Sequence, residues 1–310
     1  MKLSSLGPAL LSASLASASA QVTVEITQDQ QQFLEGESLP VAVRVINRSG
    51  QSLHLGAEAD WLSFSIQSRE NLVVSKSGEA PVVGEFELEP SKVGIKRLDL
   101  APYFQLDHPG RYAIVATVHI KEWDRDITSS PKNFDIVEGA KLWEQEIGVP
   151  QAGATNAPEV RKYILQQANY IKGHLRLYLR VTDDYGRPLR VVPIGSMVSF
   201  GRPDPPQVDK LSNLHVLYQN GPASFSYTVF NPDGEMIARQ VHDYINSRPR
   251  LFVNDDGEIK VKGGVRRVTA NDVPPPKSDE AEDESAPAAL STGNSSPSSS
   301  PASGPKSSKP

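Results

Sequence analysis

The stretch YAIVATVHI, residues 112–120, places Tyr112, Ile114, Ala116, Val118 and Ile120 at every second position. Side chains alternate between the two faces of a strand, so this spacing predicts a strand with one buried face. The same alternation recurs over residues 22–26, 41–45, 62–66, 86–88 and 134–136, with turn-forming residues between these stretches. Residues 21–137 are therefore predicted to form a two-sheet β-sandwich.

A corner precedes the 112–120 stretch. The residues His108-Pro109-Gly110-Arg111-Tyr112 resemble the approach to a late strand in immunoglobulin-like and fibronectin-like domains, where a Tyr after the corner bonds back to upstream backbone. The resemblance covers residues 22–137 and lacks the cysteine pair of antibody domains. It implies a fold used in adhesion, in carbohydrate binding, in chaperones and in accessories to secreted enzymes, so it implies no single function.

Strand patterning resumes over residues 160–268. Leu175, Leu177, Leu179 and Val181 alternate with polar residues, and turn signals such as 220–222, 231–234 and 254–257 separate later apolar runs. This half is predicted to be a second antiparallel β domain. Residues 138–159 are predicted to be a connector in which 141–144 form a helical turn or Trp143 packs at the junction.

The two ends of the chain are of different character. Residues 1–20 have the shape of a secretory signal with cleavage between Ala20 and Gln21, which predicts a periplasmic or extracellular protein. Residues 269–310 are predicted to be a disordered tail, because positions 271–310 hold 11 Ser, 8 Pro and 5 Ala and no aromatic residue. Outside the signal no apolar run approaches about 18 residues, so we expect no membrane span.

Composition restricts the chemistry. With no Cys in 310 residues, the chain has no thiol nucleophile, disulfide or Cys-based zinc site. The common hydrolase, zinc-helix and nucleotide-binding motifs are missing, and Ser129-Ser130-Pro131-Lys132 matches a Ser-x-x-Lys motif only with a proline inside it. The six histidines show no metal-ligand spacing, and the Asn/Asp/Gly clusters fit hairpin turns better than calcium loops. We therefore expect no catalytic residues, no metal and no cofactor.

Charge divides the chain into two regions. Residues 21–159 hold 12 Lys and Arg against 21 Asp and Glu, whereas residues 160–268 hold 16 against 10. Opposite net charges favour contact between the two domains. The alternative is that the basic region binds an anionic partner.

A basic and aromatic patch is the candidate binding site. If Leu175, Leu177 and Leu179 face the core, Arg176, Tyr178 and Arg180 face outward, and the return strand would place Arg187 or Arg190 beside them. Such a patch could pair with carboxylate or phosphate groups and stack on a sugar ring. The alternatives are a solvated strand face or a surface packed on the acidic first domain.

The sequence thus predicts an all-β exported protein without catalytic function, acting in binding, adhesion or envelope assembly. Its expected partner is an envelope protein or an anionic glycan and not a nucleic acid, because the chain as a whole is acidic. The alternative is a secreted hydrolase or a glycan-binding enzyme accessory that functions through the C-terminal β domain. A chaperone-like sandwich with an unpaired apolar sheet edge is a third possibility.

Overall fold

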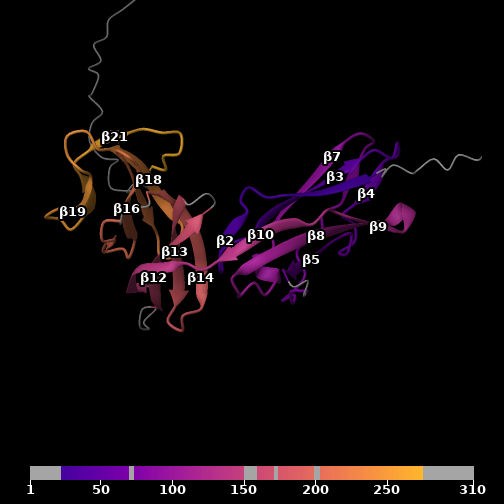
Figure 1. Cartoon of the computed structure of the whole chain (residues 1–310), viewed down its shortest axis with the longest axis horizontal. Coiled ribbons are helices and arrows are strands. Elements are labelled where there is room, and N and C mark those ends of the chain that lie inside the picture. The colour runs from indigo at the N-terminus through magenta and orange to yellow at the C-terminus, as the bar shows by residue number, and fades with distance from the viewer. Residues whose placement is uncertain (1–21, 70–72, 150–158, 171–173, 199–202, 275–310) are drawn as a thin grey trace, which may run out of the picture. The chain divides into compact units, whose positions relative to one another are not determined.

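A computed structural model describes residues 22–69, 73–149, 159–170, 174–198 and 203–274. The described chain is built from sheets whose strands pair antiparallel with one exception, and it has two short 3₁₀ turns, so the prediction of an all-β fold is confirmed (Figure 1). The predicted signal with its cleavage site Ala20–Gln21, and nearly all of the predicted tail, lie outside the described residues. Among those described, no helix has the length and apolar character needed to cross a bilayer.

Two sheets form the first half of the chain. One has the strand order β1 (Val22–Thr27), β3 (Pro40–Asn47), β7 (Val93–Asp99). The other has the order β2 (Gln32–Leu34), β10 (Lys132–Val137), β8 (Gly110–Ile120), β5 (Leu62–Ser68), and β9 (Arg125–Thr128) also pairs with β8. β2 runs parallel to β10, and the other pairs are antiparallel. Smaller elements complete this half: β4 (Leu53–Leu55), β6 (Phe86–Leu88), η1 (Ala101–Tyr103) and η2 (Lys121–Trp123).

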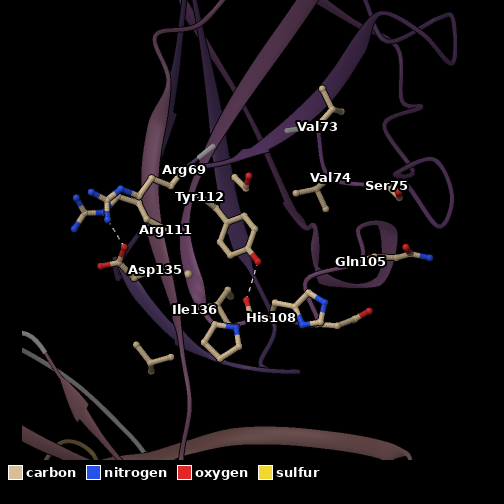
Figure 2. Close-up of a pocket in the computed structure, with 15 residues that line it drawn as sticks. Arg69, Val73, Val74, Ser75, Gln105, His108, Arg111, Tyr112, Asp135 and Ile136 are labelled. Carbon is tan, nitrogen blue, oxygen red and sulfur yellow. Dashed lines mark hydrogen bonds and ion pairs between the residues drawn. The ribbon is translucent and has the colours of Figure 1, made fainter. Parts of the chain in front are cut away.

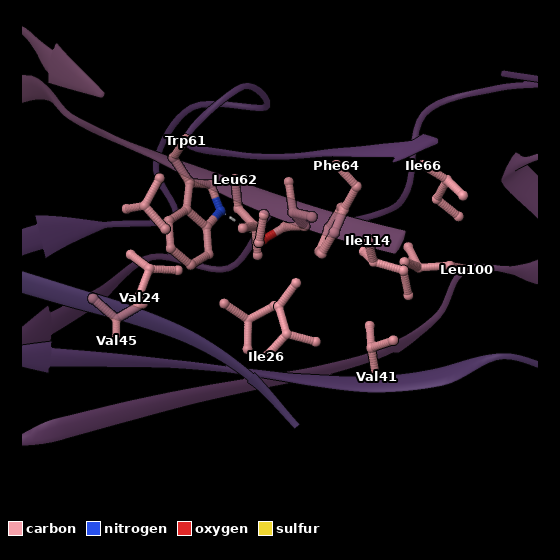
Figure 3. Close-up of a cluster of buried hydrophobic side chains, with 14 of the residues drawn as sticks. Val24, Ile26, Val41, Val45, Trp61, Leu62, Phe64, Ile66, Leu100 and Ile114 are labelled. Atoms are coloured by element: carbon pink, nitrogen blue, oxygen red, sulfur yellow. Dashed lines mark hydrogen bonds between the residues drawn. The ribbon is translucent and has the colours of Figure 1, made fainter. Parts of the chain in front are cut away.

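One apolar core joins the two sheets. The predicted inward residues of β8, from Tyr112 to Ile120, are all buried, and they meet Val24 and Val43 from the other sheet. Figure 3 shows Trp61 and Phe64 in this core above Ile26 and Val41, and the Trp61 indole donates to the Val82 carbonyl at 2.9 Å. The alternation therefore works as predicted, since it turns one face of each strand toward the same interior.

The corner before β8 is closed by a hydrogen bond. Tyr112 Oη donates to the carbonyl oxygen of His108 at 2.7 Å. The Tyr112 ring also stacks on Phe134 of β10, with ring centroids 5.5 Å apart. Both contacts fix the chain where β8 begins.

The second half also has two main sheets. The first has the order β11 (Ala140–Val149), β12 (Glu159–Tyr170), β13 (His174–Asp183), β14 (Pro188–Met197). The second has the order β15 (Gln207–Val208), β16 (Leu214–Gly221), β17 (Ser224–Phe230), β18 (Met236–Asp243), β21 (Val265–Arg267). A core between them includes Leu177, Leu179, Val216 and Phe230. The hairpin of β19 (Arg250–Val253) and β20 (Ile259–Lys262) packs Leu251 and Val261 against a further cluster around Phe225 and Tyr227.

The structure corrects one prediction in the connector. Residues 140–149 form strand β11, paired along its length with β12, where we expected a connector with either a helical turn or Trp143 packed at the junction. Trp143 lies opposite Leu165 in this pairing and packs on the core of the second half. Only Glu138 and Gly139 separate β10 of the sandwich from β11.

Candidate functional site

The predicted patch on β13 has the expected alternation but a different environment. Leu177 and Leu179 are buried in the core of the second half, so Arg176, Tyr178 and Arg180 do lie on the opposite face. That face is covered by residues 30–37, which come from the sandwich. The structure therefore places the patch in the contact between the two halves, one of the alternatives that the sequence left open.

Tyr178 is the centre of this contact. Its side chain is fully buried in a small cluster with Leu34, Ala168 and Val191. Burial, reinforced by the nearby Glu37 carboxylate, raises the pKa of Tyr178 to about 12. The phenol is thus a packed, neutral group that no external ligand can stack upon.

The two arginines of the patch bind the same segment. Arg176 donates from Nη1 to Gln30 Oε1 at 2.8 Å and lies over the Tyr170 ring at 3.8 Å. Arg180 donates from Nη2 to the Glu35 carbonyl at 2.6 Å and from Nε to Gln166 Oε1 at 3.0 Å. Their donors are therefore engaged within the chain.

Arg190 does not join the other three residues. In the pairing of β13 with β14, Arg190 lies opposite Val181 while Arg180 lies opposite Val191. Arg190 is thus on the face of the apolar residues, where it reaches Glu235 at 3.5 Å. The expected convergence of Arg190 with Arg176 and Arg180 is not found.

Glu37 is the buried acid of the contact. Its side chain accepts hydrogen bonds from the Leu34 amide and from Gln30 Nε2, each at 2.7 Å. Burial raises the pKa of Glu37, although both hydrogen bonds and the charge of Arg176 act in the opposite direction. A carboxylate of the acidic half thus faces a guanidinium of the basic half.

An open pocket of about 800 Å³ lies at the Tyr112 corner of the sandwich. We call it the corner pocket; its walls come from the end of β5, residues 73–75, the 105–112 corner and the end of β10. Figure 2 shows Tyr112 in the middle of this lining, with its hydroxyl bonded to His108 and with Val74 and Gln105 to one side. The size falls within the range of ligand pockets, and the wall combines apolar with charged groups.

The rim of the corner pocket is charged. Arg69, Arg111 and His108 lie beside Asp107 and Asp135, and Arg111 Nε pairs with Asp135 Oδ1 at 3.2 Å. Among the described residues Arg69 has no carboxylate partner. A guanidinium in this position can bind a carboxylate or phosphate group. In the sequence, Arg111 and Tyr112 stand out only as part of the corner, and no pattern identifies Arg69 or Gln105.

A second polar arrangement is buried in the C-terminal half. His215 Nε2 lies 3.2 Å from Asp209 Oδ2, and His215 Nδ1 lies 2.7 Å from Tyr227 Oη. Burial lowers the pKa of His215, although the bond to Asp209 opposes the shift, and burial raises the pKa of Tyr227 to about 12. When the His215 imidazole is neutral, its Nε2–H donates a hydrogen bond to the Asp209 carboxylate, and its Nδ1 accepts one from the Tyr227 hydroxyl.

The remaining polar motifs are used locally. Asn231 Oδ1 accepts from the amides of Asp233 and Glu235, as expected of a hairpin turn. Ser129 Oγ accepts from the Ala116 amide within the sandwich. In the described part of the chain no three His, Asp or Glu side chains gather as a metal site would require.

Comparison with known proteins gives little more. No protein-family model matches the chain, and no curated protein gives a significant match. Among solved structures it is similar to Spo0M, a sporulation control protein from Bacillus subtilis, at 11% sequence identity and a TM-score of 0.28. That match covers 57% of this chain and 90% of the other. A likeness this weak supports no inference about function.

Proposed function

We propose that this chain is an exported, non-catalytic binding protein of the cell envelope, which acts in adhesion or assembly. The signal-like residues 1–20 support export to the periplasm or the exterior. The partner is an envelope protein or an anionic glycan that binds at the corner pocket.

The sandwich is proposed to be immunoglobulin-like. Three features support this: the Tyr112 hydroxyl bond to upstream backbone, the buried Trp61 before β5, and the sheet order β10-β8-β5 facing β1-β3-β7. In immunoglobulin-like domains the third strand and the last two strands lie in one sheet. A buried Trp belongs to the third strand, and the Tyr corner lies at the start of the second-last strand.

The observation that carries the binding proposal is the corner pocket itself. Its floor is held rigid by the Tyr112 hydrogen bond and by the stacking on Phe134, while Arg69 is available on its rim. A preformed pocket binds with little loss of conformational entropy. By contrast, the Arg176, Tyr178 and Arg180 face serves contact between the acidic and basic halves.

Site-specific photo-crosslinking tests the proposal. A photoreactive residue at Gln105 should capture a partner from the envelope fraction of the host, and one at Lys92, outside the pocket, should not. Arg69→Glu should abolish the Gln105 adduct, whereas Arg97→Glu, an exposed residue of β7, should leave it intact. An adduct that survives Arg69→Glu would contradict binding at this pocket.

The alternative function is a secreted hydrolase acting through the C-terminal domain. The Asp209–His215–Tyr227 chain favours it, because an imidazole oriented by a carboxylate can activate a hydroxyl nucleophile. Turnover of p-nitrophenyl esters or glycosides should then be lost in Tyr227→Phe and kept in Ser226→Ala. The side chain of Tyr227 is 7% exposed, which favours a structural role for the chain instead.

A further inference from the structure

The β19–β20 hairpin has one apolar face and one charged face. Leu251 and Val261 lie opposite each other and pack on the cluster around Phe225. Because strands alternate, Arg250 and Phe252 of β19 project from the other face with Lys262 and Lys260 of β20. All four are exposed.

The register of this hairpin sets like charges against each other. Arg250 is directly opposite Lys262, and neither has a carboxylate partner among the described residues. Like charges at opposite positions of an antiparallel pair destabilise it. Lys260 differs, since Glu258 pairs with it at 2.6 Å toward the turn. The unneutralised cations are therefore at the open end of the hairpin, and an anion between them would relieve their repulsion.

A pocket adjoins that end. It measures about 330 Å³ and is lined by Arg248, Arg250, Gln207 and Asp204, among others. Arg248 Nη2 pairs with Asp204 Oδ1 at 3.3 Å, and Arg248 Cζ lies 5.3 Å from the centroid of the Phe225 ring. Both contacts hold the guanidinium in place. Arg250 lines the pocket and the charged face alike, so the two form one surface.

Two contacts hold the hairpin in place, one at each of its ends. Gly263 has φ of 83°, and a Cβ there would come 2.7 Å from the Arg248 carbonyl, so the chain after Lys262 packs closely on residues 248–249. At the far end of the hairpin, Lys210 Nζ donates to the Asp256 carbonyl oxygen at 2.9 Å and so fixes the turn. The hairpin is thus held in place at both of its ends.

An aromatic ring completes the surface. Phe252 is 44% exposed, and Lys262 Nζ lies 4.9 Å from its ring centroid. An exposed ring such as that of Phe252, next to cations, can stack on a ligand unit that has a flat apolar face and carries a negative charge. Carboxylated sugar units have both, and the adjacent pocket has the volume for one small group.

We propose that the β19–β20 face and its adjoining pocket bind an acidic polysaccharide through Arg248, Arg250 and Lys262, with Phe252 against a sugar ring. This site is in the C-terminal half and is separate from the corner pocket. A lipid surface is less well matched, because four of the six residues that line the pocket beside Arg250 are polar or charged.

Titration of the full chain with polygalacturonate tests the site. We expect saturable binding that weakens as salt is added, and a loss of affinity of about tenfold or more in the double variant Arg250→Glu, Lys262→Glu. The matched control is Lys92→Glu, Arg97→Glu, which makes the same charge change on the sandwich and should bind as the parent does. The single variant Arg250→Lys should bind more tightly than the double variant, because it keeps the positive charge.

Several outcomes would overturn the assignment. They are equal binding of neutral dextran, equal losses in the two double variants, or tighter binding of phosphatidylglycerol vesicles or oligothymidylate than of polygalacturonate. Circular dichroism of each variant separates lost binding from lost folding. Arg69→Glu, which tests the corner pocket, should leave polygalacturonate binding unchanged, so the two proposals fail independently.

Discussion

The sandwich has one continuous apolar core, whereas the half that follows divides its buried side chains between two clusters of its own and a third shared with residues 30–37. The second half also buries more polar groups: Thr182, Asp183, His215, Ser226, Thr228 and His242, against Glu37, Asn47 and Ser129 in the first. Buried polar groups stabilise only while their hydrogen bonds are kept. The sandwich should therefore depend more on the volume and shape of its core, and the second half more on protonation, because its buried polar groups include His215 and His242.

The largest effect is expected from a cavity in the sandwich. Phe64→Ala should lower the free energy of unfolding by about 3–5 kcal/mol, because the side chain is buried in the single core. Ser65→Ala, the next residue on the other face of β5, should change it by less than about 0.5 kcal/mol. Urea unfolding measures both, and similar losses would show that the core is not the main source of stability.

A smaller loss is expected at the contact between the halves. Arg180→Met removes hydrogen bonds to the Glu35 carbonyl and to Gln166, and should cost about 1.5–3 kcal/mol. The control is Arg190→Met, since that side chain is 46% exposed and reaches Glu235 at 3.5 Å. Scanning calorimetry should show the transition of Arg180→Met splitting in two as the halves uncouple. An unsplit transition equal to that of the control would mean that the segment 30–37 contributes little.

Acidification should affect the two halves in opposite directions. Burial lowers the pKa of His215 and His242, so the unfolded state takes up protons first and the second half loses stability as the pH falls below about 6.5. In the sandwich, the hydrogen bond to Asp126 raises the pKa of His119, which adds stability at low pH that is lost as the pH rises through the folded pKa.

Hydrogen exchange at about pH 7.5 and about pH 5.5 measures this difference, once corrected for intrinsic rates. Amides of β16 should lose protection relative to those of β8. His215→Gln should reduce the change in β16, and a parallel loss in both halves would contradict the assignment.

The smallest effect on stability is expected at the pocket rim. Arg111→Ala breaks a pair with Asp135 in which both side chains are exposed, at 64% and 44%, so the free energy of unfolding should change by less than about 1 kcal/mol. The same variant should weaken capture of the partner at the corner pocket. A large loss of stability would show that Arg111 supports the corner and does not serve binding.

The alternation of residues predicted which face of a strand is buried, but it could not predict which distant segments of the chain contact each other. The buried residues of β8 and the two faces of β13 follow directly from period-two spacing. What covers the outer face of β13 does not, because Gln30 and Glu35 are about 145 residues away in the chain. Arg190 was misplaced because the turn after Asp183 and the irregular register of β14 decide which face it takes.

Strand β11 and the corner pocket illustrate the same limit. β11 is an edge strand without alternating burial, so only its pairing with β12 reveals it. The corner pocket joins Arg69, Gln105 and Asp135 from three separate stretches, which no local pattern connects. The signals that did exist were the Pro-Gly corner and Tyr112.

The two-residue link between β10 and β11 bears on how this chain can be divided. A cut at Glu138 or Gly139 would leave the first fragment with Leu34 uncovered and the second with Tyr178 uncovered, and both side chains are fully buried in the intact chain. A side chain at position 139 would also come 2.9 Å from Leu34. The halves are thus unsuited to exchange as independent modules, and shuffling either into another protein would transfer an aggregation-prone surface with it.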